Sequence, residues 1–477
     1  MHETVRLPPA RRKPFARRRR LAAALALASC AAGARGFADD FPDVVCTDMD
    51  SIWVILGRPG GEFEITEKYY IGDGVEPWSV AIGDLTGDGL PEIVSANRFG
   101  PHVAVFWNSG RGEFESPPSL VSTPERPYDV DLGDLDRDGS LDIVVTCNYD
   151  PGEVLILYND GLGGIARSAS LRPGGETFHS VLVDLDGANG LDLVVSRNGA
   201  GDLAVYRNRG DGELAFFRNV PAVTDPKALK AGDFDADGKA DVALVNDSGG
   251  RVAIFLGDGS GGLEILASYA AGVQPRELSI VDLDGDGASD LVVAGGRGSN
   301  YVSRFLGNGD GTFRDRADFS TGPRPNSVDS ADFDLDGLAD IAVANWSLDN
   351  PSLATLSILY GDGAGGFRRK ADLVPPQGFQ KITALAAGQL DQASFVRGDV
   401  VEDRRIDITD AIAILNYLFA TGSLTCLDAA DIDDNSELQI TDPIVLLTWL
   451  FLVGEQPSPP FPRAGVDPTP DHLGCRD

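Results

Sequence analysis

An acidic motif recurs six times along the chain at intervals of 49 or 50 residues. Its copies include GDLDRDGSLDIVV and GDFDADGKADVAL, and their first acids are Asp84, Asp134, Asp184, Asp233, Asp282 and Asp332. A second motif, a short strand followed by a Gly-rich turn, alternates with the first. It occurs seven times and ends at Phe63, Phe114, Ile165, Leu214, Leu263, Phe313 and Phe367. Repeats of this length indicate an array of small supersecondary units.

Each unit contains four short β segments and shows no helical periodicity. Four strands in about 50 residues are typical of propeller blades. The chain begins the array with FPDVVCTD (41–48), an exit strand that lacks its acidic loop. The missing strand and loop start lie at the other end, in ITALAAGQLDQ from Ile382, where Gln389 and Asp391 take the places of two loop acids. We therefore predict an all-β seven-bladed β-propeller over residues 40–392, with one blade built from both chain ends.

The acidic loops place oxygen atoms on alternate residues, as in the first nine positions of an EF-hand-like calcium loop. Several carboxylates so close together repel one another unless a cation lies between them, and all-oxygen sites favour Ca²⁺. The predicted side-chain ligands are Asp84, Thr86, Asp88 and Glu92; Asp134, Asp136, Asp138 and Asp142; Asp184, Asp186 and Asp192; Asp233, Asp235, Asp237 and Asp241; Asp282, Asp284, Asp286 and Asp290; and Asp332, Asp334, Asp336 and Asp340. The predicted carbonyl ligands are Leu90, Ser140, Lys239, Ala288 and Leu338.

The third loop departs from this pattern, because Ala188 replaces the third acid and the glycine moves to Gly190. We expect this site to be weak or empty, with Asn189 as a partial replacement. The alternative for every loop is that Asp and Gly only form Asx turns between strands.

These loops and turns resemble the FG-GAP or VCBS repeats of integrin-alpha-like β-propellers, over about three quarters of the chain. The resemblance implies the fold and calcium binding. It leaves the function open, since such propellers serve as adhesion modules, lectin-like binders and enzyme scaffolds.

Residues 397–456 contain two loop-helix copies and resemble a small α-helical dockerin or EF-hand-like domain. The resemblance implies two calcium loops, with candidate ligands Asp399, Asp403, Arg405, Asp407 and Asp410 in the first and Asp431, Asp433, Asn435, Glu437 and Asp442 in the second, and with Gln439 as a further candidate. Apolar residues follow at helical spacing: Ala411, Ile414, Leu415 and Leu418, then Ile444, Leu447, Leu450 and Phe451. Dockerins bind cohesin modules through residues at the places of Ile408-Thr409 and Ile440-Thr441. The alternative is a cap on the chain's own propeller.

The N-terminal residues 1–36 read as an export signal, with a basic segment, a short apolar run and small residues. Residues 27–30 match a bacterial lipobox with Cys30 as the lipidated residue, whereas Ala34-Arg35-Gly36 suits ordinary cleavage. We expect an exported bacterial protein, either secreted or a cell-surface or outer-membrane lipoprotein, that meets a membrane only through a lipid anchor. The net charge of −33 argues against nucleic acid as a partner.

Cysteine placement gives two further expectations. Cys46 and Cys147 lie in apolar runs and are predicted to be buried thiols rather than a disulfide. Cys426 and Cys475, the latter in the Pro-rich tail 457–477, are a candidate disulfide in an oxidising compartment.

The chain carries no catalytic sequence motif such as GxSxG or HExxH. We expect a non-catalytic binding, adhesion or extracellular assembly module, with a carbohydrate or a cell-surface protein as ligand. The alternative is a polysaccharide-active hydrolase or lyase tethered by its dockerin-like part. Repeat symmetry predicts a ring of candidate ligand-face residues, unless they are ordinary linker residues: Trp78, Tyr128, Phe178, Lys227, Arg276 and Asn326, with Trp346 nearby.

Overall fold

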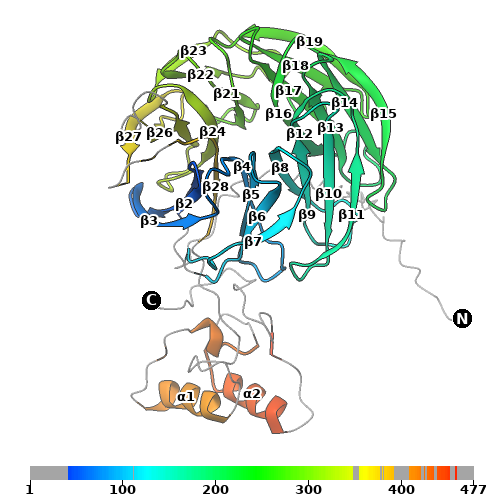
Figure 1. The fold of residues 1–477 in the computed structure, drawn as a ribbon. Helices are drawn as coiled ribbons and strands as arrows, with labels where there is room; N and C mark the ends of the chain where they lie inside the picture. Colours follow the sequence, from blue (N-terminus) through cyan, green and yellow to red (C-terminus); the bar gives the residue numbers. More distant parts are fainter. Residues whose placement is uncertain are drawn as a thin grey trace, which may run out of the picture.

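The computed structural model describes residues 41–110, 112–347, 354–375, 379, 381–390, 408–420, 424, 427–433, 438–451 and 457–458. Seven four-stranded antiparallel sheets surround a common centre, as Figure 1 shows. The predicted seven-bladed β-propeller is confirmed.

The blades are numbered along the chain. Blade 1 contains β28 (Leu385–Gly388), β1 (Asp43–Thr47), β2 (Ser51–Arg58) and β3 (Glu62–Tyr70). Blade 2 contains β4 (Pro77–Gly83), β5 (Glu92–Asn97), β6 (His102–Phe106) and β7 (Ser119–Ser122). Blade 3 contains β8 (Pro127–Gly133), β9 (Asp142–Cys147), β10 (Glu153–Asn159) and β11 (Ile165–Leu171). Blade 4 contains β12 (Thr177–Val183), β13 (Asp192–Arg197), β14 (Asp202–Asn208) and β15 (Leu214–Pro221).

The remaining three blades repeat this order. Blade 5 contains β16 (Pro226–Gly232), β17 (Asp241–Asn246), β18 (Arg251–Gly257) and β19 (Leu263–Ala270). Blade 6 contains β20 (Leu278–Val281), β21 (Asp290–Ala294), β22 (Tyr301–Phe305) and β23 (Ala317–Ser320). Blade 7 contains β24 (Pro325–Ala331), β25 (Asp340–Asn345), β26 (Thr355–Gly361) and β27 (Phe367–Leu373).

Blade 1 closes the ring with strands from both ends of the repeat array. The late strand β28 pairs with the early strand β1 in an antiparallel register that places Val45 opposite Ala386. Asp43 fastens the junction, since its carboxylate accepts the backbone N–H groups of Leu390 at 2.6 Å and Gly57 at 2.9 Å. This is the blade that the mismatch between seven turns and six loops predicted, and the pairing removes the free sheet edges.

The hydrophobic core is divided into seven clusters, each of which lies between two neighbouring blades. The cluster between blades 7 and 1 contains Trp53 and Phe333, both almost fully buried. Because every blade is covered on both faces, the central strands are apolar on both sides and lack the usual polar alternation. Cys46 and Cys147 lie in these strands as buried free thiols, as predicted.

Each Gly-rich turn packs against the acidic loop of the preceding blade. The Tyr158 hydroxyl of blade 3 donates to the carbonyl of Gly212, in the Gly-rich turn of blade 4, at 2.5 Å. Gly212 has a φ of +79°, and a Cβ there would lie 2.7 Å from the Tyr158 ring and 3.0 Å from Asp136. Glycine is therefore required at this turn both by its backbone conformation and by the close contact. The acidic loops thus form part of the blade interfaces.

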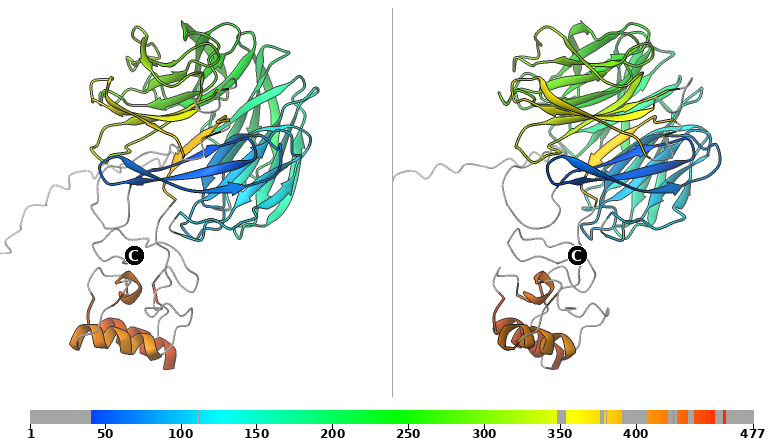
Figure 2. Two further views of the ribbon diagram at one scale, coloured as in Figure 1. Left: turned by 60° about the vertical axis from the view of Figure 1, so that its left-hand side comes forward. Right: turned by 90° about the vertical axis from the view of Figure 1, so that its left-hand side faces the viewer.

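Two helices, α1 (Ile408–Phe419) and α2 (Thr441–Phe451), and a short 3₁₀ turn (Asp428–Ala430) follow the propeller. Figure 2 draws the helices beside each other and outside the ring. They share a small core that includes Ile414 and Leu446. No described helix is long and apolar enough to cross a membrane.

The predicted apolar face of the second helix is partly wrong. Leu447 and Leu450 pack against the core, but Ile444 and Phe451 are 53% and 65% exposed, and the buried side chain is Leu446. A pair of short helices buries only the narrow stripe where the two helices meet, so apolar residues beside that stripe stay in contact with solvent.

Candidate functional site

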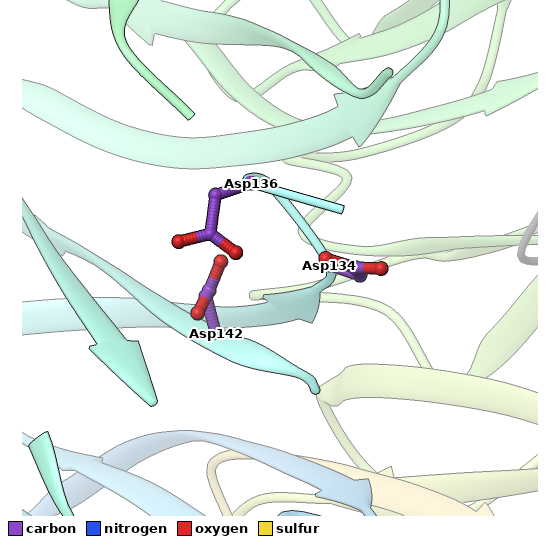
Figure 3. Close-up of side chains that lie close together, drawn as sticks. All are labelled: Asp134, Asp136 and Asp142. Atoms are coloured by element: carbon purple, nitrogen blue, oxygen red, sulfur yellow. The ribbon is translucent and has the colours of Figure 1, made fainter. Parts of the chain in front are cut away.

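The six acidic loops are numbered loops 1 to 6 along the chain, and they share one feature of backbone conformation. The fourth loop position is left-handed in every copy, whether it is glycine, Arg137, Ala236 or Leu335. In loop 2 the carboxylates of Asp134, Asp136 and Asp142 converge, with oxygen atoms within 4.8 Å of one another (Figure 3). The corresponding groups occur in four further loops: Asp184, Asp186 and Asp192; Asp233, Asp235 and Asp241; Asp282, Asp284 and Asp290; and Asp332, Asp334 and Asp336.

The last acid of each loop links the loop to the following hairpin by hydrogen bonds to the backbone. In loop 2, Asp142 accepts the N–H of Leu135 and the N–H of Asn159, both at 3.0 Å. Burial raises the pKa of Asp142 to about 6, and nearby loop acids add to the shift. The same two backbone contacts recur at Asp192, Asp241, Asp290 and Asp340.

Hydrogen bonds within the loops account for only part of the acidic oxygens. Asp134 Oδ2 accepts the N–H of Gly139 at 3.1 Å, and Asp138 Oδ1 accepts that of Ser140 at 2.8 Å, which are the predicted Asx-type contacts. Other buried oxygens accept no hydrogen bond from the described residues: Thr86 Oγ1, Asp134 Oδ1, Asp136 Oδ1, Asp233 Oδ1, Asp284 Oδ1 and Asp334 Oδ1. Buried acceptors without a donor are costly, and a set of several oxygens fits a hard cation such as Ca²⁺.

Loop 3 differs from the others in this respect. Among the described residues, none of its side-chain oxygens is buried without a hydrogen bond. Asn189 adopts a φ of +66° at the position where loop 2 has Gly139, and the next residue, Gly190, has a φ of +100°, where Ser140 of loop 2 is not left-handed. Loop 3 therefore differs from loop 2 in its backbone at the seventh position, and it lacks the feature that most suggests a cation in the other five loops.

Arginine side chains contact the outer oxygens of several loops. Arg167 approaches Asp136 Oδ2 at 3.2 Å, and Arg314 lies 3.1 Å from Asp284 Oδ2. In both acids the other oxygen, Oδ1, is the buried one without a donor. The arginine thus neutralises the solvent side of the carboxylate and leaves the inner oxygen available.

The described part of the helical segment contains a similar anchoring acid. Asp442 is fully buried and accepts the N–H of Ile432 at 2.9 Å and that of Gln439 at 2.7 Å. Burial raises its pKa. Asp410 and Asp431 are also buried, whereas Asp433 is exposed. The other candidates lie outside the described residues: Asp399, Asp403, Arg405, Asp407, Asn435, Glu437, the pair Cys426 and Cys475, and Cys30.

The predicted ligand-face residues gather around one end of the central channel, a cavity of about 270 Å³. Its lining includes Trp78, Tyr128, Lys227, Arg276 and Asn326. We call this end the channel mouth. Phe178 and Trp346 adjoin it, as the following ring contacts show.

Aromatic rings cover one side of the channel mouth. The Trp78 and Tyr128 rings lie 5.5 Å apart, and those of Tyr128 and Phe178 lie 5.0 Å apart. Trp346 meets the edge of Trp78 at 6.3 Å, and the Lys381 ammonium lies 5.0 Å from both indoles. The Lys227 ammonium lies 3.3 Å from the centre of the Phe178 ring, so cations and aromatic rings alternate at the mouth. Lys227, Arg276 and Lys381 each have an acidic neighbour.

The channel below the mouth contains a charged cluster that the sequence analysis missed. It consists of Asp129, Asp131, His179, Lys230, Glu277 and Asp329, and all six line the cavity. The signal was present in the sequence, because these charged residues interrupt otherwise apolar innermost strands at equivalent repeat positions. Asp43, which takes the place of the last loop acid at the ring closure, was missed as well.

The pKa values of the cluster are strongly perturbed. Burial alone would raise the pKa of Asp129, but the His179 imidazole, 3.3 Å away, lowers it to about 2. Burial and the Asp129 charge together raise the pKa of Asp131 to about 7. Lys230 is exposed to the channel, and the carboxylates of Glu277 and Asp329 outweigh its desolvation and raise its pKa.

The fold and its loops define a seven-bladed propeller with acidic repeat loops, and comparison with known proteins gives its family. The chain belongs to the FG-GAP-like repeat family, whose model matches residues 38–95, 84–145, 184–244, 233–293 and 282–343. It is 33% identical to human integrin alpha-7 over 139 residues and 29% identical to human integrin alpha-IIb over 203 residues. These alignments cover 25% and 34% of this chain but only 12% and 20% of the two relatives.

Solved structures of similar fold come from proteins with different activities. An Agrocybe aegerita lectin that specifically recognises non-reducing terminal N-acetylglucosamine aligns with a TM-score of 0.54 and 22% identity, over 74% of this chain and 97% of its own. The periplasmic gluconolactonase of Pseudomonas aeruginosa aligns with a TM-score of 0.54 and 19% identity, over 73% of this chain and 99% of its own. At these identities the likeness shows the shared fold alone.

Proposed function

We propose that this protein is an exported, calcium-stabilised binding module whose channel mouth recognises a carbohydrate or a cell-surface protein. The observation that carries the proposal is the gathering of Trp78, Tyr128 and Lys227 around one cavity, although they lie on three different blades. Aromatic rings beside polar groups, in a concave site on a rigid scaffold, are typical of ligand recognition.

Calcium is proposed for loops 1, 2, 4, 5 and 6. In loop 2 the side chains of Asp134, Asp136, Asp138 and Asp142, with the carbonyl of Ser140, would hold the ion. The bound cation would neutralise carboxylates that otherwise repel one another. The supporting observation is the set of buried oxygens without donors, which occurs in these five loops among the described residues. Because each loop also packs against the next blade's turn, calcium would stabilise the blade interfaces that shape the channel mouth.

The N-terminal sequence supports the proposal of export, as a secreted protein or a surface lipoprotein. The C-terminal helices are proposed to form a dockerin-like unit that binds a cohesin-like module in an extracellular assembly. In support, Ile408 and Ile440, at the positions implied by the resemblance, are 48% and 44% exposed.

A polysaccharide-active enzyme is the second candidate function. The Asp129–His179 pair and Asp131 favour it, because a carboxyl group with a pKa of about 7 is close to the range in which general acids work at neutral pH.

One experiment separates the two functions. The purified protein is applied to an array of plant, algal and bacterial glycans with calcium present, and the same glycans are assayed in solution for new reducing ends. Binding without product supports the binding module. If the native protein releases reducing ends and His179→Ala does not, the protein is a polysaccharide-active enzyme rather than a non-catalytic binding module. Absence of both binding and product would reject the carbohydrate proposal.

A further inference from the structure

The charge distribution of the central channel narrows the class of ligand. We propose that the channel binds the terminal unit of a neutral oligosaccharide, with the sugar ring at the channel mouth and its hydroxyl groups directed to the charged cluster below. This inference rests on the proposed binding function and assigns its ligand chemistry.

The aromatic side of the mouth supplies an apolar platform. Tyr128 and Phe178 are 5% and 8% exposed, so their positions are fixed by packing, whereas Trp78 is only half-buried at the rim. The guanidinium of Arg98 lies over the Trp78 ring, 4.5 Å from its centre, and helps to hold the ring in place. A sugar presents an apolar face of C–H groups that packs on such a ring, and a tightly held ring loses little entropy on binding.

The cations of the mouth do not form a free anion site. Lys227 lies 3.6 Å from Asp225, and Arg276 lies 3.3 Å from Asp247. These two positive charges therefore each have a carboxylate beside them already, as does Lys381, which lies 2.7 Å from Glu76. A carboxylated sugar would have to displace these partners or stay near them, and either costs free energy.

The lining of the cavity has no excess of positive charge. It holds four carboxylates, three fixed cations and one histidine: Asp129, Asp131, Glu277 and Asp329; Lys227, Lys230 and Arg276; and His179. Two of these cations are also paired with Asp225 and Asp247. Such a cavity gains little by admitting an anion, because no excess of positive charge compensates the anion for lost water. It offers many hydrogen-bond donors and acceptors, which match the hydroxyl groups of a neutral sugar.

The size and position of the cavity indicate recognition of a chain end. Its volume of about 270 Å³ lies just below the range of typical small-molecule sites, which is roughly 300–1,000 Å³. The channel follows the propeller axis, so a glycan enters with its end first. Farther along the same strands the lining becomes apolar, with Ile82 and Leu132. The cavity thus has room for one unit and suits the end of a chain better than the middle of a long polymer.

The test compares sugars that differ only in charge. The full-length protein with calcium is titrated calorimetrically with trigalacturonate, with its full methyl ester and with the matching neutral galactotriose. We expect both neutral trimers to bind and the carboxylate form to bind roughly tenfold more weakly. Trp78→Ala should weaken the neutral trimers roughly tenfold, and Phe216→Ala, which removes an exposed ring from an outer strand, should leave binding unchanged.

A gain-of-function variant separates the ligand class from the general binding function. Asp131→Asn keeps an acceptor for the Ser180 hydroxyl, which donates to Asp131 at 2.5 Å, and it removes one negative charge. It should bind trigalacturonate roughly tenfold more tightly than the native protein does. The native protein could instead bind trigalacturonate more tightly than its ester, and Trp78→Ala could abolish that binding. This result would overturn the inference of a neutral ligand and leave the proposed function standing. Absence of binding by all three trimers at about 10 mM, with native melting behaviour, would reject this inference and leave a cell-surface protein as the ligand of the proposed function.

Discussion

Replacing the first acid of an acidic loop should separate a calcium effect from a purely structural one. Asp134 in loop 2 and Asp184 in loop 3 occupy the same position, and each accepts a backbone N–H, from Gly139 at 3.1 Å and from Gly187 at 2.8 Å respectively. Alanine removes one such contact in both variants, which costs roughly 0.5–1.5 kcal/mol in the absence of calcium. Only Asp134 also has a buried oxygen without a donor.

The size of the calcium effect follows from ligand linkage. A site at a free calcium concentration 100 times its dissociation constant stabilises the folded state by about 2.7 kcal/mol. The strands run from Asp43 to Gly388, about 350 residues, and an unfolding entropy near 2.1 cal/mol/K per residue converts this energy into about 4 °C in Tm. Five occupied loops would contribute about 18 °C, and loop 3 nothing.

The assay is thermal unfolding with excess calcium and with excess chelator. Chelation should lower the native Tm by about 18 °C. Asp134→Ala should lose about 4 °C of that calcium-dependent difference, whereas Asp184→Ala should keep it whole. The reasoning is refuted if chelator leaves the native Tm unchanged, or if the two variants lose the same calcium-dependent difference.

Three further predictions test other parts of the structure. The pKa of Asp131 in the folded protein is raised to about 7, so its ionisation destabilises the fold as the pH rises from about 4 through 7. In urea unfolding, Asp131→Asn should therefore be as stable as the native protein at pH 4 and about 1–2 kcal/mol more stable at pH 8. Asp43→Ala leaves the buried N–H groups of Leu390 and Gly57 without an acceptor and should lower the unfolding free energy by about 2–4 kcal/mol, whereas a neutral effect would refute its role in ring closure. Gly212→Ala should lower the unfolding free energy by about 3 kcal/mol because of its close contacts. Gly139 has a similar φ and no atom within 4 Å of an added Cβ, so Gly139→Ala should lower it by only about 1 kcal/mol. Equal losses would contradict the packing argument.

The repeat pattern determined most of the fold before any coordinates. The period of about 50 residues, the four short β segments in each unit and the blade built from both ends of the repeat array all follow from local sequence signals. Repeat symmetry also placed Trp78, Tyr128 and Lys227 at equivalent positions, and the structure brings them to one channel mouth.

The charged residues inside the channel are visible in the sequence as interruptions of apolar strands, but the sequence does not show which way they face. In an ordinary sheet a charged residue in a strand faces solvent, and only the closure of seven blades turns Asp131, Lys230 and Asp329 toward a shared interior. The role of Asp43 depends on a contact with Leu390, which lies 347 positions away in the chain. The exposure of Ile444 and Phe451 depends on how two short helices meet, which helical spacing alone does not specify.

Ion positions in a crystal of the full-length protein grown with calcium test the central claim most directly. An anomalous difference map identifies calcium without reference to any assumed site. We predict peaks among the carboxylates of loops 1, 2, 4, 5 and 6, including Asp134 with Asp136, and no peak between Asp184 and Asp192. Empty loops at saturating calcium, or a peak in loop 3 as strong as that in loop 2, would contradict the account.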